Sequence, residues 1–229
     1  MSLLTGLLAK LSGLPRWFAV IGITVFAITL TAAQVDFPLM RELALSRYGA
    51  YAARVVDDWQ ERIETMKLLP DEEKLTLAND FFNSRIRGVS DTEAWGEDDY
   101  WATPLETIGR GQGDCEDFTI AKYATLVLAG VEISKLRMTY AKLSYKDGRT
   151  TPHMVLAYYP SPESDPLILD SAVIEILNGS ERTDLEPVYG FNSRGIWVTT
   201  SSNPVSTQPE ARLSKWRELL SRLSKEGLG

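Results

Sequence analysis

Residues 113–129 read GDCEDFTIAKYATLVLA, and this stretch carries the strongest information about the fold. Beyond Asp117 it is mostly apolar, which predicts a largely buried helix that begins at Cys115 and ends at Gly130. A cysteine in the first turn of a helix lies at the positive end of the helix dipole, which favours its thiolate form. Cys115 is also the only cysteine in the sequence, so no internal disulfide can form. Cys115 is therefore a candidate nucleophile.

The only histidine of the chain, His153, follows in a segment that resembles a β-strand. Strand-like runs rich in β-branched and aromatic residues occupy residues 135–145, 152–159, 167–173 and 195–200. The segment Leu-Ile-Leu-Asp ends at Asp170, and a hairpin through residues 160–166 would bring this carboxylate beside His153. An imidazole needs such a partner to fix its tautomer and support its charge. The chain order is then nucleophile, base and orienter: Cys115, His153 and Asp170.

The segments before Cys115 have a helical pattern. Residues 40–69 carry apolar side chains at helical spacing, and a second helix is expected from Pro70 through Phe82. Residues 87–113 hold several glycines and aromatic residues, which predicts a long ordered loop leading to Cys115. Helices followed by antiparallel strands indicate an α+β fold.

Both ends of the chain differ from this central domain. Lys10 and Arg16 precede an almost uncharged run at residues 17–35, which is typical of a secretory signal peptide or of an uncleaved membrane anchor, with a buried core helix as a third reading. We expect residues 1–35 to be this segment, 36–205 the catalytic domain and 206–229 a C-terminal amphipathic helix. That helix either packs on the domain or docks a partner.

Composition excludes several classes of protein. The net charge is −7 and the isoelectric point is near 4.9, which argues against nucleic-acid binding because phosphate contacts need clustered Lys and Arg. One cysteine and one histidine cannot build a structural zinc site.

Three acidic residues surround the candidate nucleophile: Asp114, Glu116 and Asp117. Like charges raise the pKa of a thiol, so this setting opposes the thiolate unless something offsets it. In one reading Asp114 caps the helix, and Glu116 and Asp117 interact with its dipole. In the other, the carboxylates bind a hard cation such as Ca²⁺, although no EF-hand pattern is present. The residues alone leave both readings open.

A longer stretch resembles a known family. Residues 100–123, YWATPLETIGRGQGDCEDFTIAKY, together with His153-Met-Val-Leu and Leu169-Asp170-Ser, are similar to the bacterial transglutaminase-like cysteine proteases of the periplasmic LapG type. The similarity covers roughly residues 40–205. It implies a papain-like α+β fold in which Cys115 is the nucleophile, His153 the general base and acid, and Asp170 the orienter.

The resemblance also implies a cofactor, a location and partners. It implies a required Ca²⁺, with Asp114 and Glu116 as ligands. Asp117 is a third implied ligand, on a weaker match to the family's acidic residues. It further implies a periplasmic enzyme that cuts a large surface adhesin near its N-terminus and so promotes biofilm dispersal. An inner-membrane cyclic-di-GMP receptor is the implied inhibitor.

Two other functions use the same residues. A Cys, His and Asp set also serves transglutaminases and amidases, which are acyl-transfer enzymes. A non-catalytic, calcium-dependent binding module is the second alternative. Amine incorporation would reveal the first, and retention of function after Cys115→Ala would reveal the second.

Overall fold

The computed structural model describes residues 35–198 and 203–228. The segment predicted to be a signal peptide or membrane anchor, residues 1–35, lies outside these residues except for Val35, so its role stays a prediction. Among the residues described, none of the helices combines the length and the apolar character that crossing a membrane requires.

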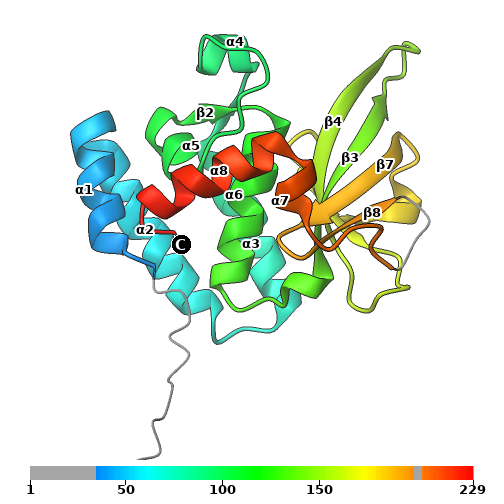
Figure 1. Ribbon diagram of the computed structural model, residues 1–229, viewed down its shortest axis with the longest axis horizontal. Helices are drawn as coiled ribbons and strands as arrows, with labels where there is room; N and C mark the ends of the chain where they lie inside the picture. The colour runs from blue at the N-terminus through cyan, green and yellow to red at the C-terminus, as the bar shows by residue number, and fades with distance from the viewer. Residues whose placement is uncertain (1–34, 199–202, 229) are drawn as a thin grey trace, which may run out of the picture. The chain divides into compact units, whose positions relative to one another are not determined.

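Helices come first along the described chain and an antiparallel sheet follows, so the predicted α+β class is confirmed (Figure 1). The α-helices are α1 (Phe37–Tyr48), α2 (Ala50–Met66), α3 (Asp71–Arg85), α4 (Asp91–Ala94), α5 (Pro104–Arg110), α6 (Cys115–Leu128), α7 (Pro209–Arg212) and α8 (Ser214–Lys225). Short 3₁₀ turns are η1 (Ile133–Lys135) and η2 (Gly179–Glu181).

The main sheet has the strand order β6-β5-β4-β3-β7-β8, with every neighbouring pair antiparallel. Its strands are β3 (Leu136–Ser144), β4 (Thr150–Tyr158), β5 (Leu167–Leu169), β6 (Leu177–Asn178), β7 (Leu185–Asn192) and β8 (Gly195–Val198). A separate parallel pair, β1 (Arg87–Gly88) and β2 (Gln112–Gly113), encloses the segment that leads to α6.

Helix α6 lies between two apolar clusters, which explains why its sequence is apolar on more than one face. On one side Phe118 and Ala121 pack among α1, α2, α3 and α5. On the other, Ile120 and Leu126 pack against the sheet and α8, where they meet Met154. A helix buried on both sides is held firmly, so its first residue, Cys115, has a fixed position.

The helical pattern of residues 40–69, which allows one long helix or two, is two helices, since Gly49 has φ +92° and interrupts it. Other expectations need correction. The expected loop at residues 87–113 contains α4 and α5, and α5 begins with a capping box formed by Thr103 and Glu106. Strand β7 was not expected at all.

The C-terminal segment forms two helices rather than one, because the backbone is extended at Leu213. In α8 the side chains of Trp216, Leu219 and Leu223 are buried. The Trp216 ring packs against Phe191 with ring centroids 5.6 Å apart. The apolar stripe of α8 thus forms part of the core, and Figure 1 shows the helix lying across α6.

Candidate active site

Cys115 is the first residue of α6, and its neighbours close the helix end around it. The Asp114 carboxylate accepts hydrogen bonds from the backbone N–H groups of Glu116 and Asp117, at 3.1 and 3.5 Å. Asp117 in turn accepts from the backbone N–H of Asp114 at 3.3 Å. This reciprocal capping box satisfies N–H groups that a helix start leaves without partners. The nucleophile candidate therefore stands on a defined helix terminus.

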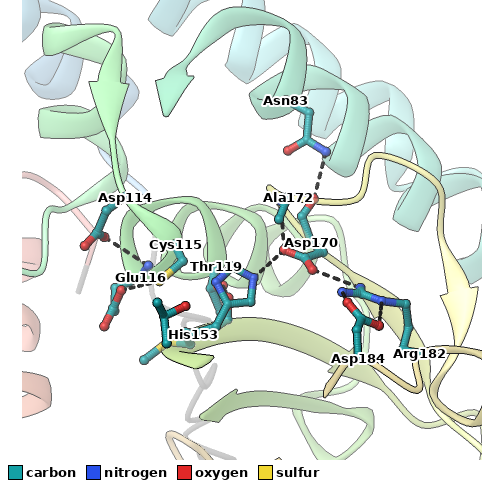
Figure 2. A network of polar contacts seen from close by, with 12 residues as sticks. Asn83, Asp114, Cys115, Glu116, Thr119, His153, Asp170, Ala172, Arg182 and Asp184 are labelled. Atoms are coloured by element: carbon teal, nitrogen blue, oxygen red, sulfur yellow. Dashed lines mark hydrogen bonds and ion pairs between the residues drawn. The ribbon is translucent and has the colours of Figure 1, made fainter. Parts of the chain in front are cut away.

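Two contacts tie this first turn of α6 to strand β4. The backbone N–H of Met154 acts on the Cys115 thiol and works to lower its pKa, against the larger effect of burial. One turn further on, the Thr119 hydroxyl donates to the carbonyl of Met154 at 3.1 Å. Because Met154 directly follows His153, the thiol and the imidazole are brought to adjoining positions. In the view of Figure 2 the His153 ring lies between Cys115 and Asp170.

His153 and Asp170 form a close buried pair. Nε2 of His153 lies 2.7 Å from Oδ1 of Asp170, and the two residues are 7% and 1% exposed. The pairing of β4 with β5 produces this contact, because Asp170 directly follows the last residue of β5. Burial works against ionisation of Asp170, but the hydrogen bond and charge of His153, with further donors, lower its pKa to about 2. Asp170 is therefore ionised at neutral pH.

Other polar groups around Asp170 were not foreseen from the sequence. The guanidinium of Arg182 forms an ion pair with it, with Nη1 2.9 Å from Oδ2. The backbone N–H of Ala172 donates to Oδ1 at 2.9 Å. Asn83 of α3 and Lys122 of α6 both donate to the backbone carbonyl of Asp170, each at 2.9 Å. Figure 2 shows this network beside the His153 ring, except for Lys122.

The surroundings of the thiol are acidic. Oε2 of Glu116 lies 2.6 Å from Sγ of Cys115, and the Tyr140 hydroxyl donates to Oε1 of the same carboxylate at 3.4 Å. Burial, followed by the charges of Glu116 and Asp114, raises the pKa of the Cys115 thiol far above its ordinary value. Burial and the same kind of repulsion raise the pKa of Asp114 to about 9. These side chains are suited to a positive charge placed among them.

Asp91, at the start of α4, joins this acidic group and was not predicted. One carboxylate oxygen each from Asp91, Asp114 and Asp117 lie within 4.8 Å of one another. Atoms of Asp114, Cys115 and Glu116 form a second such group. Oδ2 of Asp91 accepts the backbone N–H of Tyr100 at 2.7 Å, but its buried Oδ1 has no hydrogen-bond partner among the residues that the structure describes. Oxygen atoms gathered in this way fit the preference of Ca²⁺.

Asp117 has a structural role as well. It is fully buried, and Oδ1 accepts the backbone N–H of Ala102 at 2.7 Å while Oδ2 accepts Nε1–H of Trp95 at 3.1 Å. Burial raises its pKa to about 7 against the opposing effect of these donors. Asp117 thus fastens the segment between α4 and α5 to the start of α6. Its oxygens are less free for a cation than those of Asp114 and Glu116.

Comparison with known proteins places this architecture in a family. A profile described as bacterial transglutaminase-like cysteine proteinase, BTLCP, matches residues 51–185. The EGTA-treated structure of LapG from Legionella pneumophila is 40% identical, with a TM-score of 0.72, over 84% of this chain and 100% of that one. Its calcium-bound structure is also 40% identical, with a TM-score of 0.70, over 82% and 99%. No curated protein sequence matches. The chain belongs to the bacterial transglutaminase-like cysteine proteinases.

Proposed function

We propose that this protein is a calcium-dependent cysteine endopeptidase with Cys115 as nucleophile, His153 as general base and acid, and Asp170 as orienter. The observation that carries the proposal is the 2.7 Å contact between Nε2 of His153 and Asp170. The hydrogen bond from Thr119 to the carbonyl of Met154, the residue after His153, holds this part of β4 against the helix that begins at Cys115. Membership of a cysteine proteinase family supports the same reaction class.

The geometry suggests how the reaction proceeds. Since Asp170 is ionised, it accepts a hydrogen bond from Nε2–H of His153. The unprotonated Nδ1 is then the atom that takes the proton of the thiol. The Cys115 thiolate then attacks the peptide carbonyl, and His153 returns that proton to the leaving amine. Water hydrolyses the resulting thioester with His153 as base. The products are a carboxylate and the regenerated thiol.

Calcium enters the proposal through the acidic group. Asp114 and Glu116 would hold the ion, with the partnerless oxygen of Asp91 close by. A bound divalent cation supplies positive charge that lowers the cost of a thiolate between these carboxylates. The calcium-bound structure of the Legionella relative supports this part of the proposal.

The substrate, location and partner rest on the sequence resemblance. We propose that the enzyme acts in the periplasm, exported or anchored by its N-terminal segment. Its substrate is the N-terminal region of a large repeat adhesin, whose release promotes biofilm dispersal. An inner-membrane cyclic-di-GMP receptor restrains the enzyme by binding it through its periplasmic domain.

One experiment tests activity, substrate and metal together. The purified protein is incubated with N-terminal fragments of large adhesins from the same genome, in Ca²⁺, in Mg²⁺ or in EGTA. We expect cleavage in Ca²⁺, none in EGTA, and rescue by added Ca²⁺ but not Mg²⁺. Cys115→Ala should reduce cleavage by several orders of magnitude while binding Ca²⁺ normally.

Other outcomes would contradict the proposal in different ways. Cleavage that is indifferent to EGTA would rule out the calcium requirement. Coupling of a primary amine to glutamine, with every adhesin fragment uncut, would favour a transglutaminase. Unchanged function in Cys115→Ala would favour a binding module.

A further inference from the structure

We propose that Arg182 is a positioning residue that fixes the Asp170 carboxylate and, through it, the tautomer of His153. The inference rests on the proposed function, since it assigns His153 the role of base. Arg182 directly follows η2. The sequence pattern did not single it out, and the proposed reaction assigns it no step. Figure 2 shows it on the side of Asp170 opposite His153.

The two oxygens of Asp170 have different partners. Oδ1 faces His153 at 2.7 Å and also accepts the backbone N–H of Ala172. Oδ2 forms an ion pair with Nη1 of Arg182 at 2.9 Å, without the alignment of a hydrogen bond. The hydrogen bonds at Oδ1 and the ion pair at Oδ2 together oppose rotation of the carboxylate about its terminal bond. Its Oδ1 lone pair therefore stays directed at Nε2 of His153, which must carry the proton.

Arg182 is itself immobilised, so it can serve as a fixed reference for Asp170. Its Nε and Nη2 atoms donate to the two oxygens of Asp184, at 2.9 and 2.8 Å. This fork-to-fork contact restricts the guanidinium to one plane. The Arg182 side chain is only 3% exposed, so water does not compete for these contacts. A chain of charges thus runs from Asp184 through Arg182 and Asp170 to His153.

The backbone of Asp170 is fixed independently of Arg182. Asn83 and Lys122, from helices α3 and α6, hold its carbonyl oxygen. Removal of the guanidinium should therefore leave Asp170 in place while freeing its side chain to turn. A buried ion pair by itself is weak grounds for a stabilising role. What distinguishes a positioning role is an effect on catalysis and on the imidazole that a loss of stability does not produce.

The experiment compares Arg182→Met, Arg182→Lys and Asp184→Asn with Arg47→Met as the matched control. Arg47 pairs with another buried carboxylate, Glu226, at 2.8 Å. Each variant is assayed for kcat, KM and Tm in Ca²⁺. The ¹⁵N spectrum of the imidazole is recorded on untagged protein, where His153 is the only histidine and needs no assignment.

We expect Arg182→Met to lower kcat by about 10²-fold, the usual cost of a misplacement near 1 Å, with KM nearly unchanged. Its imidazole spectrum should move from the Nε2–H tautomer towards a mixture. Arg182→Lys, which keeps the charge, should recover much of kcat, and Asp184→Asn should give an intermediate loss. Arg47→Met should lower Tm while leaving kcat and the spectrum as in wild type.

The result that overturns the inference is an Arg182→Met or Asp184→Asn protein with wild-type kcat and an unchanged imidazole spectrum. The inference is also overturned if Arg47→Met loses as much kcat per degree of lowered Tm as Arg182→Met does, because the loss would then follow from lower stability. If Arg182→Met does not fold, Asp184→Asn and Arg182→Lys decide by the same two readouts. Failure of the proposed function is separate: wild-type protein would cut no fragment, while the spectra would still report whether Arg182 sets the tautomer.

Discussion

Replacement of Gly113 by alanine should disturb the start of α6, because the space beside Gly113 is already filled. A β-carbon there would lie 2.6 Å from Oδ2 and 2.8 Å from Cβ of Asp117, whereas ordinary contact begins at 3.4 Å. Asp117 cannot withdraw, since it is fully buried and bonded to Ala102 and Trp95. The added methyl group must therefore displace β2 or the first turn of α6, which carries Cys115.

The size of the effect follows from two opposing contributions. Overpacking of this kind costs about 1–3 kcal/mol, while alanine restricts the unfolded chain and returns about 0.4–1 kcal/mol. We expect a net loss of between about 0 and 2.6 kcal/mol in the free energy of unfolding. A shift of Cys115 by about 1 Å would lower kcat by about 10²-fold. Catalysis should therefore suffer more than stability.

Gly88→Ala is the matched control, because Gly88 pairs with Gly113 across β1 and β2. A β-carbon at Gly88 meets no atom within 4 Å. Urea unfolding and peptide cleavage in Ca²⁺ should show wild-type or slightly higher stability and unchanged kcat for Gly88→Ala. If Gly113→Ala behaves like Gly88→Ala in both assays, the argument that Asp117 fixes the position of Cys115 is wrong.

Three further predictions concern the metal, a buried lysine and the last helix. Ca²⁺ should raise Tm and speed alkylation of the single thiol by iodoacetamide, and Asp114→Asn or Glu116→Gln should weaken both responses in a titration with EGTA-buffered Ca²⁺. Burial lowers the pKa of Lys122 from 10.5 to about 7, so the unfolded state binds more protons between these values and stability should rise with pH there. Because Asp114, with its pKa near 9, contributes a slope of opposite sign in the same range, the test is a difference: between pH 7 and 9 the slope in urea unfolding should be more positive for wild type than for Lys122→Met by up to about 1.4 kcal/mol per pH unit, and equal slopes would contradict the assignment. Trp216→Ala should cost about 3–5 kcal/mol in thermal or urea unfolding, because the ring is 2% exposed, whereas a change below 1 kcal/mol would mean that α8 is not part of the core.

Local sequence patterns predicted the features that depend on neighbouring residues. The apolar run after Cys115, with an acidic cap before it, specifies α6 because capping and burial act within a few residues. The position of Asp170 beside His153 follows from one hairpin, whose two strands both have β-rich composition.

Features that depend on distant segments gave no such pattern. Arg182 reaches Asp170 only after the irregular stretch that contains β6 and η2, so no spacing relates the two residues. Asp91 lies near Asp114 because it begins the short helix α4. The sequence around Asp91 predicts only a loop, so it does not indicate this position. Strand β7 carries Pro187 and Gly190, which both weaken a strand pattern, yet pairing with β3 and β8 stabilises it.

The position of Cys115 between two charged networks explains why a cation and a triad belong to one site. An ionised carboxylate 4.8 Å from a thiolate, the upper limit of the separations in this group, repels it by about 3.5 kcal/mol at an effective dielectric constant of 20, and a closer one repels it more. Repulsion of this size from Glu116 already outweighs a helix dipole, which contributes about 0.3–1 kcal/mol and at most about 2 kcal/mol, and Asp114 adds to the repulsion wherever it is ionised. A divalent cation reverses this balance because it adds two positive charges where the carboxylates converge. In the proposed function, the acidic residues therefore make thiolate formation dependent on the metal, while Asp170 and Arg182 hold the proposed base, His153, on the other side.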